Sequence, residues 1–235
     1  MLRPLEGKLA LVTGASRGIG AATAEALAAA GAHVILTART AAGLENVEER
    51  IHAHGGAATI APLDLTDPES IGRLGQAISG RWDALDILVL NAAMLGTLAP
   101  VQHLDAKEFA QIMTLNVSAQ QALIATFDAM LRQSKAAYVI GVTSSVGAAP
   151  RAYWGAYGAS KAALETLLGA YAQENLSIGR IKVAIVDPGA TATKMRERAY
   201  PGEDPATLKG PEVVAERIVE LIGTPFETGS KIRVN

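Results

Sequence analysis

A tyrosine and a lysine stand four residues apart in the segment Tyr157-Gly158-Ala159-Ser160-Lys161. If the segment is helical, this spacing places the phenol and the ammonium group on one face. A free tyrosine has a pKa of about 10, and a nearby cation favours the phenolate, which brings proton exchange closer to neutral pH. The pair therefore indicates acid/base chemistry, although an ordinary surface pair is the simpler explanation of these two residues alone.

A glycine-rich turn, Thr13-Gly14-Ala15-Ser16-Arg17-Gly18-Ile19-Gly20, follows the first apolar stretch and opens an alanine-rich segment. At such a place the free N–H groups of a helix start can meet a dinucleotide pyrophosphate, and glycines allow the backbone to approach closely. The spacing is Gly-x3-Gly-x-Gly, so the common Gly-x-Gly-x-x-Gly fingerprint is not matched. A tight strand-to-helix turn without a ligand is the alternative.

In this order along the chain, the glycine-rich turn and the Tyr157/Lys161 pair resemble the short-chain dehydrogenase/reductase family, and the resemblance covers essentially the whole sequence. Ser144 lies thirteen residues before Tyr157, which is the family's spacing for the serine that hydrogen-bonds the substrate oxygen. Its neighbour Ser145 is the second choice. Asn116 matches the family's fourth catalytic residue, which holds a water in a proton relay.

The resemblance implies an oxidoreductase that moves a hydride between a nicotinamide cofactor and a carbonyl/secondary alcohol pair. In the reduction direction Tyr157 would supply a proton to the carbonyl oxygen, which Ser144 orients and polarises. Lys161 would contact the nicotinamide ribose and stabilise the phenolate. Asn116 and water would return protons from solvent.

The resemblance also implies cofactor contacts along the chain. Asp64 looks like the family's adenine-contacting aspartate, with a helix cap or turn acid as the alternative. Asn91 and Ala92 stand at the family's Asn-Asn-Ala-Gly motif, where Leu90 replaces the first Asn and Ala93 the Gly. The full expected set is Gly14, Ser16, Arg17, Gly18, Ile19, Gly20, Arg39, Asp64, Leu65, Asn91, Ala92, Tyr157, Lys161, Pro188, Gly189, Thr191 and Thr193, the last of these on the nicotinamide carboxamide.

The end of the second predicted strand favours NADP(H) over NAD(H). NAD-preferring relatives carry an acid there that bonds the ribose 2′-hydroxyl and repels a 2′-phosphate. This chain has Ala38 at that position, followed by Arg39, whose guanidinium can bind phosphate through paired hydrogen bonds. Arg17 occupies the family's other basic position for the same phosphate, although either arginine alone could be a solvated surface residue.

Positioning these residues requires a scaffold, and Val-, Ile- and Leu-rich stretches alternate with segments of helical periodicity along the whole chain. The alternation predicts one domain over residues 1–235, with a doubly wound, seven-stranded parallel sheet of the Rossmann type flanked by helices. Strands are expected at 8–12, 33–38, 57–63, 86–91, 136–143, 182–187 and 230–234, and helices near 18–30, 42–54, 68–80, 105–131, 152–175 and 211–223. Residues 194–210 lack clear periodicity and are expected to form a mobile substrate lid.

Composition excludes several other classes of protein. Lys and Arg number 21 against 23 Asp and Glu, and charged residues make up only 19% of the chain, which favours neither nucleic acid nor an anionic membrane as a partner. The absence of cysteine excludes disulfides and thiolate metal ligands, and we expect no metal site. No apolar run is long enough to suggest a signal peptide or a membrane span, so we expect a cytoplasmic protein.

Two other functions fit the sequence less well. A catalytically silent NADP(H)-binding sensor or scaffold could use the same fold, but the complete Ser144/Tyr157/Lys161/Asn116 set argues against it. A serine hydrolase is not supported, since no Gly-x-Ser-x-Gly elbow is present.

The substrate and the assembly are less well defined by the sequence. The expected pocket residues are mostly apolar and suggest a hydrophobic carbonyl compound: Met94, Leu95, Tyr153, Trp154 and Met195. The family's habit of pairing two long helices, here 105–131 and 152–175, predicts a homodimer or homotetramer.

Overall fold

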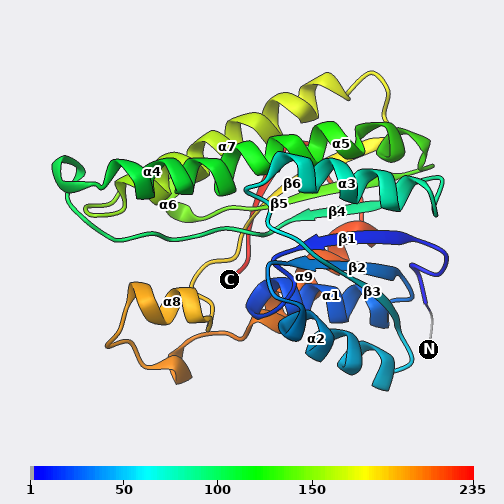
Figure 1. Ribbon diagram of the computed structural model, residues 1–235, viewed down its shortest axis with the longest axis horizontal. Helices are drawn as coiled ribbons and strands as arrows, with labels where there is room; N and C mark the ends of the chain where they lie inside the picture. The colour runs from blue at the N-terminus through cyan, green and yellow to red at the C-terminus, as the bar shows by residue number, and fades with distance from the viewer. Residues whose placement is uncertain (1–2) are drawn as a thin grey trace.

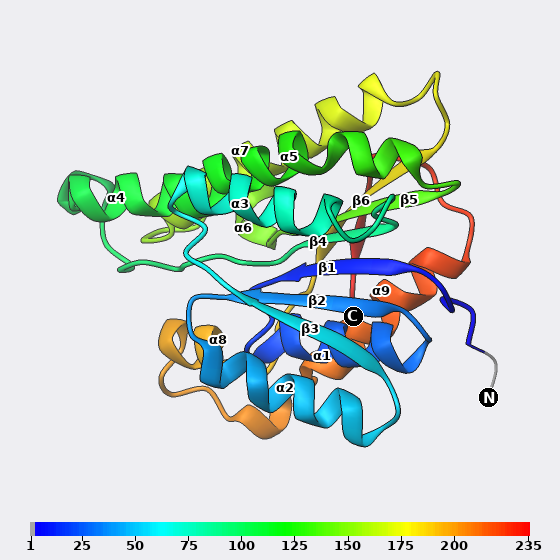
Figure 2. The same ribbon diagram turned by 45° about the vertical axis from the view of Figure 1, so that its right-hand side comes forward.

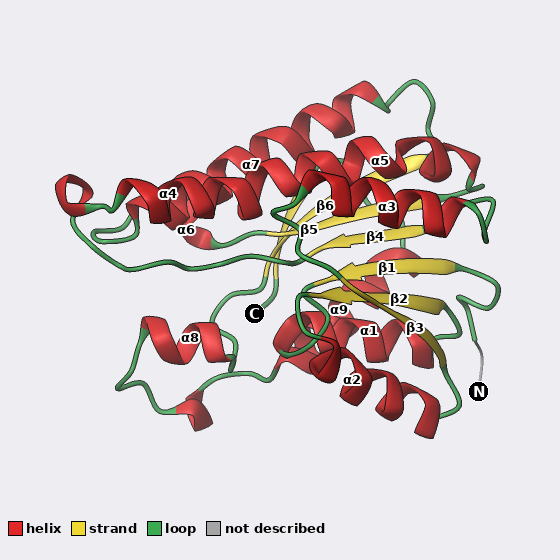
Figure 3. Cartoon of the chain, in the orientation of Figure 1, coloured by secondary structure: helices red, strands yellow, loops and turns green. Residues whose placement is uncertain are grey.

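The computed structural model describes residues 3–235, in which strands and helices alternate along the chain (Figures 1 and 3). The strands form one sheet in the order β3-β2-β1-β4-β5-β6-β7, and every neighbouring pair is parallel. They are β1 (Leu9–Thr13), β2 (His33–Ala38), β3 (Ala57–Pro62), β4 (Ile87–Leu90), β5 (Ala137–Val142), β6 (Ile181–Asp187) and β7 (Ser230–Arg233). The predicted doubly wound parallel sheet is confirmed.

Helices cover both faces of the sheet (Figures 1 and 2). One face carries α3 (Pro68–Ser79), α5 (Ala119–Gln133) and α7 (Gly155–Glu174), and the other carries α1 (Gly18–Ala29), α2 (Ala41–Ala53) and α9 (Pro211–Gly223). Two apolar cores result, one on each side of the sheet. Every residue of the central strands β1 and β4 is buried, because these strands have helices on both faces.

The predicted single helix over 105–131 is wrong in one respect, because a π-helical turn interrupts it. The structure has α4 (Ala106–Met113), a π-helical turn (Thr114–Ser118) and α5. The side-chain amide of Gln120 donates to the carbonyl oxygen of Leu115 at 2.9 Å inside this turn. A π-turn inserts one residue into the helical repeat, which hydrophobic periodicity does not reveal.

Residues 194–210 contain more regular structure than their sequence suggests. Thr193 accepts a hydrogen bond from the N–H of Arg196 at 3.2 Å and so caps a short helix, α8 (Lys194–Ala199). A 3₁₀ turn follows at Pro205–Thr207, capped by Asp204. Two other short elements were not predicted, a 3₁₀ turn at Val101–His103 and the one-turn helix α6 (Ser145–Ala148).

The carboxyl ends of the strands meet at one edge of the sheet, on the left in Figure 1, where α6 and α8 lie beyond the strand ends. The strand order reverses between β1 and β4, and in open parallel sheets ligands bind outside the carboxyl ends at this reversal. Among the helices of residues 3–235, none has the length and apolar character needed to cross a bilayer.

Candidate active site

The glycine-rich turn leads from β1 into α1 with backbone geometry that only glycine adopts easily. Gly18 has φ +56°, in the left-handed region. A Cβ on Gly20 would lie 2.3 Å from the carbonyl oxygen of Gly14 and 2.5 Å from the side-chain nitrogen of Asn91, so no larger residue fits there. Arg17 occupies the N-cap position of α1 without a side-chain cap bond. The turn therefore offers the first N–H groups of α1 to an anion, as a dinucleotide site requires.

Thr13 ties this turn to the end of β4. Its buried hydroxyl donates to the carbonyl oxygen of Val89 at 3.1 Å and accepts from the N–H groups of Asn91 and Ala92 at 2.9 and 3.0 Å. The Asn91 side chain in turn donates to the carbonyl oxygen of Thr13 at 2.9 Å. Asn91 and Ala92, which the resemblance assigns to the cofactor, thus lie against the glycine-rich turn.

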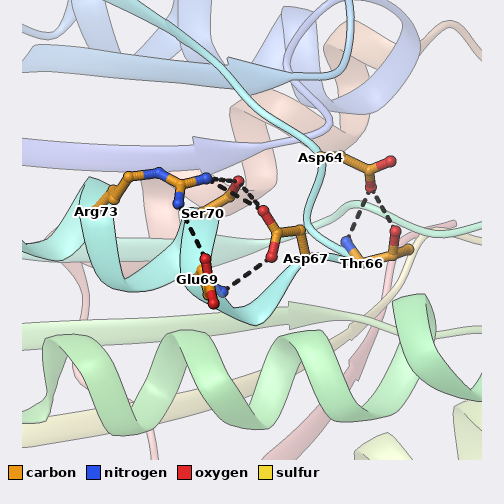
Figure 4. Close-up of polar contacts among 6 residues, drawn as sticks. All are labelled: Asp64, Thr66, Asp67, Glu69, Ser70 and Arg73. Atoms are coloured by element: carbon orange, nitrogen blue, oxygen red, sulfur yellow. Dashed lines mark hydrogen bonds and ion pairs between the residues drawn. The ribbon is translucent and has the colours of Figure 1, made fainter.

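Asp64 follows β3 and forms a local turn with Thr66 (Figure 4). Its Oδ1 accepts from the N–H and the hydroxyl of Thr66 at 2.9 and 2.8 Å, and these bonds hold the pKa of Asp64 below its usual range, with a smaller contribution from Arg39. Asp67, in contact with Ser70 and Arg73 in the same view, is the residue that caps α3. Asp64 is therefore a turn acid, as in the alternative interpretation. Its carboxylate is exposed, and its hydrogen bonds within residues 3–235 involve Oδ1 alone, so these bonds do not prevent Oδ2 from contacting an adenine.

Arg39 stands exposed at the end of β2, directly after Ala38. Its positive charge acts on Asp64 at the end of the neighbouring strand β3. Arg17, also exposed, stands at the start of α1. Both arginines therefore lie at the β1 to β3 part of the sheet, whereas Tyr157 lies on α7, which covers the part formed by the strands from β4 onward.

Tyr157 and Lys161 lie on α7, one helical turn apart, as predicted, and both are buried. The Nζ atom of Lys161 lies 5.6 Å from the centre of the Tyr157 ring and donates to the carbonyl oxygen of Val142 at 2.8 Å. Burial lowers the pKa of Lys161 to about 8, and the carboxylate of Glu165 opposes this shift.

The pKa of Tyr157 is shifted in the direction opposite to the one expected from a neighbouring ammonium. Burial raises it above its ordinary value, and the carboxylate of Asp187 acts in the same direction. Desolvation disfavours the charged phenolate, so the pKa rises although the ammonium of Lys161 lies nearby. Tyr157 is therefore a protonated phenol near neutral pH in this arrangement.

Asn116 lies in the π-helical turn and is almost fully buried. Its side chain accepts from the N–H of Met94 and donates to the carbonyl oxygen of Met94, both at 2.9 Å. It also donates to the hydroxyl of Ser160 at 3.0 Å, and Ser160 donates to the carbonyl oxygen of Tyr157 at 2.8 Å. Asn116 is therefore joined to α7 through Ser160 and to the segment after β4 through Met94.

Ser144 stands between β5 and α6, where it is partly exposed. The segment that it opens packs closely on α7: a Cβ on Gly147 would lie 3.1 Å from the Cβ of Lys161, and a Cβ on Gly158 would lie 2.9 Å from the carbonyl oxygen of Val146. The structure thus brings the Ser144 segment against the helix that carries Tyr157.

Apolar side chains pack around Tyr157. Leu95 and Val146 form a small buried cluster with Tyr157, and Leu98, Trp154, Met195 and Ala199 pack against it. The Tyr157 hydroxyl lies 3.8 Å from the sulfur of Met195, which belongs to α8. Of the expected pocket residues, Tyr153 is an exception, since its side chain is 60% exposed.

The stretch after β6 reaches the glycine-rich turn from the other side. A Cβ on Gly18 would lie 3.4 Å from the methyl group of Thr193, so the two segments are in contact range. Gly189 adopts φ +62°, and the hydroxyl of Thr191 donates to the carbonyl oxygen of Pro188 at 2.9 Å. Thr191 is therefore a turn residue, whereas Thr193 lies beside the glycine-rich turn.

Comparison with known proteins agrees with this geometry. A family model described as short chain dehydrogenase matches residues 8–204. The chain belongs to the short-chain dehydrogenase family. It is therefore an oxidoreductase, as the resemblance in the sequence predicted.

Individual members of the family are similar over nearly the full chain. The uncharacterized oxidoreductase YciK of Escherichia coli is 35% identical over 93% of this chain and 87% of its own length. A 3-oxoacyl-[acyl-carrier-protein] reductase of rhamnolipid biosynthesis from Pseudomonas aeruginosa is 34% identical over 98% and 96%. A short-chain dehydrogenase of Shigella flexneri, crystallised with NADP, superposes with a TM-score of 0.95 at 34% identity, covering 100% of this chain and 99% of that one.

Sequence reasoning missed four polar residues that the site uses: Thr13, Gln120, Thr143 and Glu165. Thr13 could have been found from its place at the strand end before Gly14. Glu165 also carried a signal, because it follows Lys161 by one helical turn on the buried face of α7. Gln120 and Thr143 form their contacts across the fold, with Ala92 and Glu165 respectively, and no local pattern announces them.

Proposed function

We propose that this protein is an NADP(H)-dependent reductase or dehydrogenase that interconverts a carbonyl compound and a secondary alcohol. The observation that carries the proposal is the meeting of Tyr157, Lys161 and the Ser144 segment at the carboxyl edge of the sheet, beside a glycine-rich turn with an uncapped helix start. The fit of the cofactor rests on that turn, since Gly14 and Gly20 leave no room for a side chain.

The nicotinamide would supply the hydride when bound, and the protein would handle the proton. Tyr157 gives its proton to the substrate oxygen, a role that suits a phenol whose raised pKa keeps it protonated. The Ser144 hydroxyl orients and polarises the same oxygen. Lys161 holds the ribose of the cofactor and stabilises the phenolate that remains, and Asn116 takes part through a water in returning protons.

The preference for NADP(H) rests on Arg39 and Arg17, with Ala38 in the place of an acid. We propose that these arginines bind the 2′-phosphate. The related Shigella flexneri protein crystallised with NADP supports this choice.

The proposed substrate is an apolar carbonyl compound, because Leu95, Val146, Trp154 and Met195 pack in one apolar cluster with Tyr157. The name of the Pseudomonas aeruginosa relative, a 3-oxoacyl reductase, fits a substrate with an aliphatic chain. Residues 194–210 would act as the lid of this pocket, since Met195 covers the Tyr157 hydroxyl and Tyr200 packs on Trp154 with ring centres 5.7 Å apart.

The test is a screen of ketones, aldehydes, quinones, steroids and 3-oxoacyl thioesters with NADPH, in which turnover is measured as the loss of nicotinamide absorbance. We expect turnover with apolar carbonyl compounds and little with small hydrophilic ones. Tight binding of NADPH without turnover of any member would instead indicate a sensor or scaffold.

A further inference from the structure

Glu165 is a buried carboxylate at the back of the catalytic helix. Its side chain is only 7% exposed, and it follows Lys161 by one turn of α7. Oε1 accepts a hydrogen bond from the hydroxyl of Thr143 at 2.5 Å, and Oε2 forms an ion pair with Lys231 of β7. Burying a carboxylate is costly, and an apolar residue at this position would avoid that cost. Packing alone therefore does not account for a carboxylate at this position.

The partners of Glu165 lie at the point where the chain leaves β5 for the catalytic serine. Thr143 immediately precedes Ser144, and its own N–H is held by the carbonyl oxygen of Val186 at 2.8 Å. Lys161 donates to the carbonyl oxygen of Val142, one residue earlier. Two side chains one turn apart on α7 thus hold two consecutive residues of the strand end. Because Tyr157 is on the same helix, these bonds fix the Ser144 segment relative to the Tyr157 hydroxyl.

The two bonds differ in what they can do during a reaction. In the proposed function Lys161 also serves the cofactor ribose and the phenolate, whereas the side chain of Glu165 bonds to Thr143 and Lys231. The charged groups around Lys161 are Glu165 on its own helix and, behind it, Lys231 of β7; Asp187 of β6 acts on the neighbouring Tyr157. Glu165 is the group whose negative charge acts directly on the ammonium.

We propose that Glu165 is a positioning residue for the reaction, which anchors the Ser144 segment to α7 through Thr143 and supplies the negative charge beside Lys161. This inference rests on the proposed function, because it assumes that Ser144 and Lys161 serve the substrate and the cofactor. It makes two separable statements, one about the hydrogen bond and one about the charge.

The charge is tested with Glu165→Gln, which retains an oxygen for the Thr143 hydroxyl. Without the carboxylate, Lys161 loses its proton at a lower pH and with it the attraction for the cofactor. We expect the pH at which NADPH binding weakens, measured by nicotinamide fluorescence between pH 6 and 10, to fall by about one unit relative to wild type. An unchanged midpoint in the folded variant overturns the electrostatic role.

The hydrogen bond is tested with Thr143→Val, which keeps the shape of the side chain, and Thr143→Ser, which keeps the hydroxyl. We expect the valine variant to lose about tenfold or more in kcat with unchanged NADPH affinity, and the serine variant to recover most of the rate. The control is Thr166→Val on the same helix, where the exposed hydroxyl bonds only the carbonyl oxygen of Ala162 in the described contacts. Equal kcat for Thr143→Val and Thr166→Val overturns the positioning role.

The outcomes separate this inference from the proposed function. Wild-type protein that fails to bind NADPH contradicts both. Wild-type protein that binds NADPH and reduces no carbonyl compound contradicts the proposed function, while the binding midpoint of Glu165→Gln still decides the electrostatic role. Circular dichroism confirms that each variant is folded before its result is counted.

Discussion

At the scale of single residues, the site combines groups with opposed pKa shifts that share one cause. Burial raises the pKa of Tyr157 and lowers that of Lys161 to about 8, since it disfavours the charged form of each. The phenol is thereby kept protonated, and the carboxylate of Glu165 opposes the loss of charge on the amine. In the proposed function, a bound and negatively charged cofactor would act on the same ammonium in the same direction as this carboxylate.

Tyr157→Phe tests the acid. The substitution keeps the ring in its apolar cluster and removes only the hydroxyl, which contacts the sulfur of Met195. We expect NADPH affinity to persist and kcat to fall by about two to four orders of magnitude, measured in steady-state kinetics with the best substrate of the screen. Turnover near that of wild type would exclude Tyr157 as the proton donor.

Arg39→Ala and Ala38→Asp test the cofactor preference. A charge-assisted contact contributes about 1.5–3 kcal/mol, so the loss of Arg39 should weaken NADPH binding roughly ten- to a hundredfold while changing NADH binding little. The aspartate should add repulsion of the 2′-phosphate. The measurement is the ratio of kcat/KM for NADPH and NADH in the three proteins, and a wild type that prefers NADH would contradict the assignment.

The positions of the site residues were partly predictable from the sequence. The spacing of Tyr157 and Lys161 placed both on one helix face, and Ser144 was placed through the family's spacing. The direction of the Tyr157 pKa shift was not predictable, because it depends on burial by Leu95, Val146 and Met195, which come from three distant segments.

At the scale of elements, the alternating apolar stretches predicted every strand of the sheet. The central strands β1, β4, β5 and β6 are buried on both faces and are recognisable as continuous apolar runs. The π-helical turn escaped prediction, since the residues around Asn116 keep a helical pattern on either side of it. Its position depends on contacts with Met94 and Ser160 that lie far away in sequence. Helix α8 was missed because, with six residues, it is too short to show a period.

The contact between β5 and α7 gives a prediction about stability. A Cβ on Gly141 of β5 would lie 2.1 Å from a methyl carbon of Leu168, which is fully buried on α7. Gly141→Ala must therefore displace Leu168, and we expect a loss of about 1–3 kcal/mol in the free energy of unfolding, measured by urea denaturation.

Gly169→Ala, the next residue on α7, is the matched control. Apart from its chain neighbours and the backbone of its own helix, no atom of the described residues lies within 4 Å of the added Cβ, so alanine should be neutral or stabilise the helix by up to about 1 kcal/mol. Equal effects of the two substitutions would show that the tight contact at Gly141 has no influence on stability.

At the scale of the whole molecule, we expect a homodimer or homotetramer formed through α4 and α7. A shallow apolar hollow lies between them, lined by Val101, Leu104, Ala106, Phe109, Gly155 and Ala159. Val101 is 71% and Phe109 37% exposed, which is unusual for large apolar side chains unless they meet a partner. Light scattering at micromolar concentration should give a multiple of the 24.3 kDa chain, and Phe109→Glu should shift the mass towards the monomer. A monomeric wild type would reject this prediction.

The position of β1 in the middle of the sheet has a consequence for synthesis on the ribosome. β1 pairs with β2 on one side and with β4 on the other, and β4 begins only at Ile87. While the chain is made, β1 to β3 can assemble first, which leaves the β4-facing edge of β1, a strand buried throughout in the folded protein, without its partner. A nascent chain that stalls before Asp86 therefore exposes an unpaired strand edge that can pair with other chains. Fragments of this length should aggregate or bind chaperones under conditions in which the full chain does not.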